Sequence, residues 1–494
     1  MKKLNRAFAL FMALCMASSM FACAGESDGS ADTDIVTTNA AETSPEETED
    51  TRVYPDLPTD VTFNGEDFKF LHWEVLSWND NNSKDLYAEA EIGDTINDAV
   101  YRRNVAIEDQ YGVKFSVDYK GHDVVINDYN KIITSNDSPY DVIFPRLTDS
   151  TSFVAQGYYY NLKNLPYINF ENPWWDQKSV QDLSIDNKLF MVASDITIID
   201  KDATAAMIFN KQMVLDYNLP DMYELVNTGK WTLDVMLDAT KGVAGDIDGN
   251  SVIDQNDRYG IIGQLDFSMS AFTGAGARFA TKDEDDLPVY TFYNEKNIAI
   301  CEKILDIMYD KENFFNAHLW ESTTADSNDM FANNQGLYKW IRLDDVTRLR
   351  QTETEFGIIP TPKYEESQEE YYSTISVHTC GLITIPVIYD KPEKAGLILE
   401  ALAAESKYTL QPAYYDIALK TKGARDDESA AMLDIIVNQR VYDFGDIFGF
   451  GDFASTWLQL TRSGNQDIAS LYEKNEKKIN KAIDKLVEKV TELD

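Results

Sequence analysis

The stretch of residues 188–210 constrains the fold more than any other part of this sequence. Apolar residues fill positions 189–193 and 196–199, a polar break at Ser194 and Asp195 separates the two runs, and a further strand ends at Asn210. Short apolar runs bounded by polar residues are typical of buried strands. Because long α/β stretches precede and follow this segment, it predicts a crossover between two lobes. We expect Asp195 at the hinge and the functional site between the lobes.

The length and charge of the chain restrict the number of lobes and the class of ligand. A chain of 494 residues exceeds one ordinary hydrophobic core, so at least two lobes are expected. It holds 84 acidic residues against 44 Lys and Arg, which gives a formal net charge of -40. This excess of negative charge opposes binding to nucleic acid and to anionic membrane surfaces. Neutral solutes and cations are therefore the expected ligands.

The first residues predict export. Lys2, Lys3 and Arg6 precede an apolar run over 7–21, which is short for a membrane span, and small residues lead to Cys23. This pattern resembles a bacterial lipoprotein signal, with residues 1–22 removed and Cys23 carrying the lipid. An ordinary secretory signal cut nearby is the alternative. Residues 23–58 are acidic and poor in apolar side chains, which predicts a disordered tether. We therefore expect an extracytoplasmic protein that is lipid-anchored to the bacterial cell membrane.

Two cysteines lie in the folded part of the chain. Cys301 and Cys380 are far apart in the sequence, and a single such pair defines no disulfide framework. Both a disulfide and two buried free thiols are compatible with this spacing.

The order of elements after residue 60 indicates an open α/β sheet. Residues 68–73 and 113–119 have the pattern of strands, residues 96–111 that of a helix between them, and residues 140–144 that of a further short strand. Ligands of such sheets bind beyond the carboxyl ends of the strands. The loops at 73–81 and 145–148 are therefore candidate ligand loops, which makes Trp73, Trp78 and Arg146 candidate contacts.

Residues 246–257 have the spacing of a loop that wraps a hard cation. Oxygen-bearing side chains occupy loop positions 1, 3, 5, 9 and 12, and position 7 supplies a backbone carbonyl; the predicted ligands are Asp246, Asp248, Asn250, Val252, Asp254 and Asp257. A flexible loop suits Ca²⁺ better than Mg²⁺. Ser251 replaces the usual glycine at position 6, so we expect weak binding with a structural role. An acidic surface loop without metal is the alternative.

Six further segments of the chain carry a family resemblance when they are taken together. They are NPWWDQ at 172–177, KLFMVASD at 188–195, MIFNKQMVLDYNLP at 207–220, GKWTLD at 229–234, GAGARF at 274–279 and FGIIPTPKY at 356–364. Each segment is unspecific alone, but their order across residues 60–460 resembles that of an extracellular solute-binding lipoprotein of an ABC importer, from the sugar-binding family that includes maltose-binding proteins.

The resemblance implies a periplasmic-binding-protein-like α/β fold, whose two lobes are joined by hinge crossover strands and close on a solute. The implied first lobe holds 59–197 and 361–424, and the second holds 198–360 and 425–494 with the cation loop. The implied ligand is a sugar, expected to be an oligosaccharide, and the implied partner is an importer permease; a monomer is expected.

The resemblance also implies which residues meet in the cleft. Trp340 and Trp457 match positions where these proteins stack sugars, and Phe267 matches more loosely. The full implied ligand set is Trp340, Trp457, Trp78, Trp73, Arg146, Asp195, Phe267 and Arg342. The alternatives remain open, because a lone tryptophan is often a core residue and the arginines equally suit ion pairs. Trp174 and Trp175, beside Pro173, are expected in the core.

Other functions fit the sequence less well. The four histidines are scattered, with no metal-ligand spacing, and no nucleophile elbow or phosphate loop is present, so we expect no enzyme activity. A carbohydrate-active enzyme needs only two carboxylates and remains the first alternative. A surface attachment protein is the second, although attachment modules of this kind carry two cation loops in tandem.

Overall fold

The computed structural model describes residues 52–74, 85–319, 324–349, 352–421 and 423–493. Contacts between residues divide the chain into two units, Met1–Arg52 and Val53–Asp494, and the features below belong to the second. The predicted signal peptide, Cys23, the tether up to residue 51, and Trp78 lie outside the described residues. Among the described helices, none combines the length and the apolar character needed to cross a membrane.

A parallel sheet forms the first lobe. Its order is β2-β1-β3, with β1 at Glu66–Trp73, β2 at Val113–Lys120 and β3 at Val142–Phe144. Helix α2 (Thr95–Tyr111) connects β1 to β2, and α3 (His122–Ser135) connects β2 to β3. The Asp94 side chain accepts hydrogen bonds from the first backbone N–H groups of α2, and Gly112, at φ 62°, ends the helix. The predicted strand-helix-strand order is confirmed.

A five-stranded mixed sheet forms the second lobe. Its order is β10-β4-β9-β5-β8, in which β4 is antiparallel to β9 and β10 while β5 is parallel to β8 and β9. The strands are β4 (Ala205–Asn210), β5 (Tyr259–Gly263), β8 (Phe314–Asn316), β9 (Gly336–Arg342) and β10 (Phe356–Ile359). Every residue of β4, β5, β9 and β10 is buried, as expected for a sheet covered on both faces.

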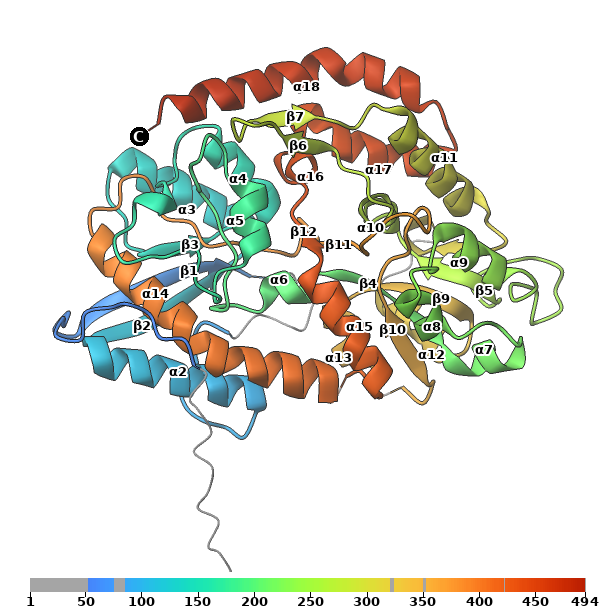
Figure 1. Cartoon of the computed structure of the whole chain (residues 1–494), viewed down its shortest axis with the longest axis horizontal. Coiled ribbons are helices and arrows are strands. Elements are labelled where there is room, and N and C mark those ends of the chain that lie inside the picture. Colours follow the sequence, from blue (N-terminus) through green and yellow to red (C-terminus); the bar gives the residue numbers. More distant parts are fainter. Residues whose placement is uncertain (1–51, 75–84, 320–323, 350–351, 422, 494) are drawn as a thin grey trace, which may run out of the picture. The chain divides into compact units, whose positions relative to one another are not determined.

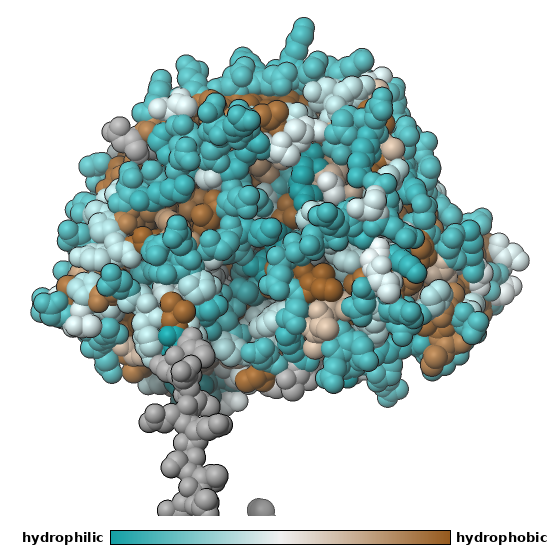
Figure 2. All heavy atoms as spheres, in the orientation of Figure 1, coloured by the Kyte–Doolittle hydropathy of each residue, from teal (hydrophilic) through white to brown (hydrophobic). Residues whose placement is uncertain are grey.

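Helices surround both sheets. Those that follow α3 are α4 (Leu147–Val154), η1 (Leu162–Asn164), α5 (Gln177–Leu183), α6 (Ile199–Asp202), α7 (Lys211–Asp216), α8 (Met222–Asn227), α9 (Leu233–Thr240), α10 (Phe267–Gly274), α11 (Glu295–Tyr309), η2 (Ala317–Leu319), α12 (Thr324–Ala332) and α13 (Leu343–Leu349). The later ones are α14 (Pro392–Tyr408), the π-helix η3 (Pro412–Thr421), α15 (Asp427–Asn438), α16 (Phe444–Phe448), η4 (Phe450–Asp452), α17 (Phe453–Ser463) and α18 (Ile468–Thr491). Thr232 caps α9, since its hydroxyl accepts a hydrogen bond from Val235 N. Figure 2 shows hydrophilic residues over most of one face.

Three chain segments lie side by side between the sheets. Thr204, directly before β4, pairs with Ile375, and the short strand β11 (Ser373–Thr374) pairs with β12 (Arg440–Val441). Figure 1 shows α6, β11 and β12 between the sheet of β1 to β3 and the sheet that contains β4. These segments are the crossovers expected of two lobes joined by a hinge.

The predicted short strands within 189–199 are wrong in detail. Val192 makes one isolated bridge with Ile383 and Ser194 makes one with Trp175, but no continuous strand forms, and Ile199 begins α6. The apolar residues of this run are buried because they pack between other elements rather than in a ladder. The strand ending at Asn210 is confirmed as β4.

Helix α18 extends along one side of the second unit, where Figure 1 shows it above β7 (Pro288–Tyr290) and α17. Its apolar stripe buries Ile468, Ile479, Leu486 and Val490, as its 3.6-residue period predicts. The Tyr472 ring stacks on Tyr293 with 4.4 Å between ring centroids. Helix α18 is therefore an amphipathic helix that packs through its apolar stripe.

A buried carboxylate holds the NPWWDQ segment. Glu400 of α14 is 1% exposed and accepts hydrogen bonds from Asn172 Nδ2 at 2.6 Å, Trp175 Nε1 at 2.8 Å and Trp174 Nε1 at 3.2 Å. Both indoles are buried, which confirms their expected place in the core. The NPWWDQ segment therefore links helix α14 to the crossover.

Replacing Glu400 by alanine is expected to lower the free energy of unfolding by about 3–5 kcal/mol, because it leaves buried donors without an acceptor. Glu400→Gln retains one acceptor oxygen and is expected to lose less. Urea unfolding followed by fluorescence measures both changes. Equal stability of Glu400→Ala and the unmutated protein would contradict this assignment.

Candidate ligand cavity

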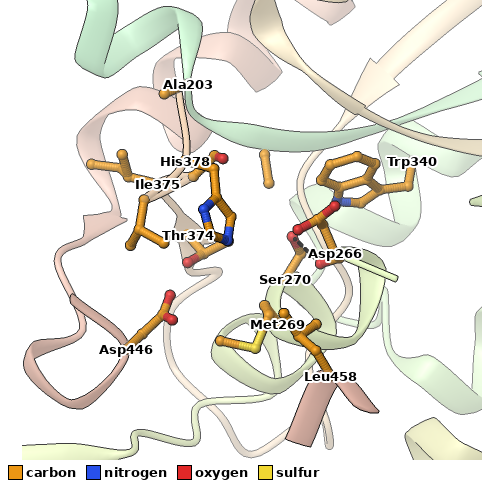
Figure 3. Close-up of a pocket in the computed structure, with 13 residues that line it drawn as sticks. Ala203, Asp266, Met269, Ser270, Trp340, Thr374, Ile375, His378, Asp446 and Leu458 are labelled. Carbon is orange, nitrogen blue, oxygen red and sulfur yellow. Dashed lines mark hydrogen bonds between the residues drawn. The ribbon is translucent and has the colours of Figure 1, made fainter. Parts of the chain in front are cut away.

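A small cavity lies where the crossover segments meet α10, β9 and the C-terminal helices. The residues that line it are Ala203, Ala205, Asp266, Met269, Ser270, Trp340, residues 374–378, Asp446 and Leu458. Figure 3 shows these side chains converging from opposite sides. The space open to water is about 30 Å³, and one water needs about 10–15 Å³. A sugar ring therefore enters only if the lobes separate.

Trp340 presents an indole to the cavity from β9. The residue is 3% exposed, and its Nε1 donates a hydrogen bond to Ser270 Oγ at 2.9 Å. The Ser270 hydroxyl in turn donates to the Asp266 backbone carbonyl at 3.2 Å. This chain fixes the ring orientation, as a binding surface for a flat apolar ligand face requires.

Two carboxylates and one imidazole supply polar groups. Asp266 stands at the start of α10, Asp446 lies in α16 and His378 follows β11; all three line the cavity. Burial, with the nearby charges of Asp443 and Asp266, raises the pKa of Asp446 well above its usual range. Loss of hydration lowers the pKa of His378, against the opposing effect of Asp266. A protonated Asp446 can donate a hydrogen bond, and a neutral His378 can donate from one ring nitrogen and accept at the other, so the cavity offers donors as well as acceptors.

A hairpin of the second lobe contacts the segment before the crossover. Strands β6 (Ala280–Lys282) and β7 (Pro288–Tyr290) form this hairpin. Lys282 Nζ donates to Ser184 Oγ at 2.7 Å, while the Asp286 carboxylate accepts from Ser184 Oγ at 2.9 Å and from Asn187 N at 2.9 Å. These polar contacts hold the two lobes together beside the crossover, which agrees with the small volume of the cavity.

No protein-family model matches the sequence, and no curated protein matches it. Solved structures do match. An ABC substrate-binding protein from Listeria monocytogenes in complex with cycloalternan is 11% identical, with a TM-score of 0.53, over 87% of this chain and 100% of that one. A maltose/maltodextrin-binding domain from Bdellovibrio bacteriovorus bound to maltotriose is 12% identical, with a TM-score of 0.50, over 86% and 99%.

A solute-binding protein of an ABC transporter from Agrobacterium radiobacter, in complex with ribitol, is 11% identical with a TM-score of 0.53, over 85% of this chain and 99% of that one. The chain has the periplasmic-binding-protein fold. The predicted two-lobed α/β fold with hinge crossovers is thereby confirmed. The cavity described above lies at the crossovers of this fold.

Three aromatic residues predicted for the ligand site lie in the hydrophobic interior. Trp73, Phe267 and Trp457 are each at most 1% exposed, and none lines the cavity. Phe267 packs on Phe314, and Trp457 lies near Phe272. The immediate neighbours of two of them, Asp266 and Leu458, do line the cavity. Of the predicted ligand residues that the structure describes, Trp340 alone is part of the lining.

The predicted polar contacts form ion pairs outside the lining. Arg146 pairs with Asp149 at 2.9 Å, and Arg342 makes a bidentate pair with Asp344. Asp195 lies 3.5 Å from Lys201, and burial raises its pKa. These pairs agree with the alternative role left open for both arginines, and they place Asp195 in the crossover region as a structural carboxylate.

Sequence reasoning missed Asp266, Ser270, His378 and Asp446. Position gives a signal for two of them, because Asp266 stands directly before α10 and His378 follows β11. Ser270 and Asp446 lie inside α10 and α16, where only the rotation of the helix brings them to the cavity. Residue type alone did not separate these four from the many other polar residues of the chain.

The predicted cation loop brings part of its ligand set together. Carboxylate oxygens of Asp246, Asp248 and Asp257 lie within 4.8 Å of one another. Ser251 adopts φ 65°, the conformation that usually requires glycine at this loop position. The Asp246 carboxylate accepts hydrogen bonds from Gly249 N and Ser251 N. The Asp254 carboxylate instead accepts a hydrogen bond from Asn256 N, so this side chain folds back onto the backbone turn that contains it.

Both remaining cysteines are free and buried, so Cys301 and Cys380 do not pair. Burial raises the pKa of each thiol well above its usual range, which favours the unreactive protonated form.

Proposed function

We propose that this protein is an extracytoplasmic solute-binding protein that captures a carbohydrate between its lobes and delivers it to an ABC importer. We expect an oligosaccharide as the solute and a monomer as the functional form. The observation that carries the proposal is the cavity at the crossovers, which is lined by the Trp340 indole and by the carboxyl groups of Asp266 and Asp446. Binding without bond cleavage is part of the proposal.

The chemistry of the cavity suits a sugar. Pyranose rings have apolar C–H faces that pack on an indole, and their hydroxyl groups donate to carboxylates and hydroxyls. Three proteins of the same fold hold cycloalternan, maltotriose and ribitol, all rich in hydroxyl groups. Since the cavity is too small for a sugar in this arrangement, the lobes must open for entry and close on the ligand.

A thermal-shift screen over mono- and oligosaccharides, followed by titration calorimetry, tests this function. At a ligand concentration of one hundred times Kd, binding stabilises the folded state by about 2.7 kcal/mol. We expect at least one saccharide to give such a shift and to be recovered unaltered after incubation. Release of shorter sugars would favour the enzyme alternative, and the absence of any shift across the panel would contradict the proposal.

We also propose that Cys23 carries the lipid anchor. The motif at residues 1–23 supports this, and so does the acidic segment up to residue 58, which separates Cys23 from the folded unit. In a bacterial host the protein is then expected in the membrane fraction, with Cys23→Ser shifted to the soluble fraction. A Cys23→Ser variant that remains in the membrane fraction would contradict lipidation at this residue.

We further propose that the loop at residues 246–257 binds Ca²⁺ as a structural cation. The gathered oxygens of Asp246, Asp248 and Asp257 support this, as does Ser251 in the conformation that such a loop requires. Asn250, Asp254 and the Val252 carbonyl complete the proposed set, with Asp254 acting after a side-chain rotation or through water. The loop's place between α9 and β5 favours a structural role over a catalytic one.

Added Ca²⁺ is expected to raise the free energy of unfolding by about 1.4–2.7 kcal/mol when its concentration is ten to one hundred times Kd, with Kd on the order of 10⁻⁴ to 10⁻³ M. Thermal unfolding with Ca²⁺ and with EDTA measures the change. Asp248→Asn removes one charged ligand and should reduce the Ca²⁺ effect, while Asp238→Asn, on α9 outside the loop, should not. Identical unfolding curves with Ca²⁺ and with EDTA would contradict the site.

A further inference from the structure

Two tight turns from different lobes meet near the cavity. One is the turn of the β6–β7 hairpin, residues 283–287, and the other is residues 185–188, directly after α5. In the second turn, Ile185 and Lys188 exchange both backbone hydrogen bonds at 2.9 Å. Figure 1 shows β6 and β7 between α5 and α17. Strand β6 also packs against α16, which contributes Asp446 to the cavity lining.

Asp286 joins the two turns. Its backbone carbonyl accepts a hydrogen bond from Asp186 N at 3.1 Å, and its carboxylate accepts from Asn187 N and from Ser184 Oγ, both at 2.9 Å. Asp186 and Asn187 have φ 51° and 59°, the conformation of a two-residue hairpin turn. Two successive N–H groups of one lobe therefore donate to a single residue of the other.

Lys282 adds a second set of bonds from the hairpin. Its ammonium pairs with Asp286 and donates to the Gln181 carbonyl, to Ser184 Oγ at 2.7 Å and to the Ser184 carbonyl at 3.3 Å. The side chains of Lys282 and Asp286 are 17% and 18% exposed. An ion pair in full contact with water contributes little, but here both charges are sheltered and both make charge-assisted hydrogen bonds to the other lobe.

Each turn is fixed to its own lobe. At the base of the hairpin, the Phe279 and Phe292 rings stack with 5.5 Å between centroids, and Phe292 packs on Phe453 of α17 at 4.6 Å. The segment after the other turn is held by Leu162 N, which donates to the Leu189 carbonyl at 2.7 Å. The hairpin therefore moves with the second lobe, and separation of the lobes must break the bonds of Lys282 and Asp286.

We propose that the contact of Lys282 and Asp286 with residues 181–187 is a latch, which holds the lobes closed without ligand and must open before a solute enters. Polar bonds suit a latch, because their donors and acceptors bond to water once the lobes part. An apolar contact would instead oppose opening in proportion to its area. The inference rests on the lobe opening that the proposed function requires, but not on the identity of the solute.

Variants of the latch test this inference. Asp286→Gly removes the carboxylate, and glycine adopts the φ of 61° at this position without strain. It is expected to lower the ratio of closed to open molecules at least about tenfold, because charge-assisted hydrogen bonds between the lobes are lost. Ser184→Ala removes the bridging hydroxyl from the other lobe and should cause a smaller change in the same direction. Asp285→Asn is the matched control, since it removes an exposed negative charge from the same turn.

Distances between spin labels on the two lobes measure this ratio in the ligand-free protein. Ser152→Cys on α4 and Glu302→Cys on α11 provide exposed labelling positions in a chain that also carries Cys23→Ser. Cys301 and Cys380 are buried and stay unlabelled. Electron–electron double resonance is expected to give one short distance with the intact latch and with Asp285→Asn. A longer distance should appear in addition with Asp286→Gly, with folding checked by circular dichroism.

Three results would overturn the latch. They are an unchanged distance in folded Asp286→Gly and Ser184→Ala, a longer distance already populated to the same extent with the intact latch, and an equal opening in Asp285→Asn. Each of these results leaves the proposed function intact, because the saccharide screen tests that function separately. Conversely, failure of every saccharide would overturn the proposed function while the label distances still decide on the latch.

Discussion

Replacing Trp457 by alanine is expected to lower the free energy of unfolding by about 3–5 kcal/mol, because truncating a large core side chain leaves a cavity. Trp457 is fully buried in α17 near Phe272 and does not line the ligand cavity. Urea unfolding measures the loss. Trp457→Phe should retain most of the stability, since Nε1 of this indole has no hydrogen-bond partner among the described residues.

The same variants also test where the residue acts. If Trp457→Ala remains folded at low temperature, its saccharide affinity should stay within a few-fold of that of the unmutated protein. A stable Trp457→Ala variant that has lost saccharide binding would contradict the placement in the core and support the stacking role that the family resemblance implies.

Replacing Trp340 by alanine is expected to reduce saccharide affinity by on the order of 2 kcal/mol, about thirtyfold, as removal of a buried aromatic anchor does. The Trp340 indole faces the cavity and is oriented by Ser270. Trp340→Phe keeps an aromatic face and should retain more of the affinity. Calorimetry compares the variants with the tightest saccharide of the panel.

Stability must be measured beside affinity, because Trp340 is also buried. Ser270→Ala is the matched control: it removes the hydrogen bond to the indole but leaves the ring. It should therefore cost less affinity than Trp340→Ala. An unchanged affinity in folded Trp340→Ala would exclude this ring from the ligand site.

Local sequence signals predicted those elements whose structure depends on nearby residues. Helix α2 has a capping Asp94 and a terminating Gly112, and α18 has an apolar stripe, so both were predictable from short windows. Residues 189–199 were not, because an apolar run becomes a strand only where a neighbouring strand supplies a ladder. Here the neighbour is the segment around Ile383, and it contributes one isolated bridge.

The site was harder to predict than the fold. Sequence reasoning selected Phe267 and Trp457, and the structure buries both while the adjacent Asp266 and Leu458 reach the cavity. Adjacent residues of a helix point about 100° apart. The rotation of the helix about its own axis therefore decides which of them faces the cavity, and tertiary packing sets that rotation. The hydrogen bond between Glu400 and Trp175 was equally hard to predict, since 225 residues of chain separate the two.

A crystal structure with the tightest-binding saccharide tests the central claim most directly. We expect the sugar between the lobes at the crossovers, with a ring face on Trp340 and polar groups on Asp266 and Asp446. A saccharide bound outside this cavity, with these three side chains making no contact to it, would contradict the account.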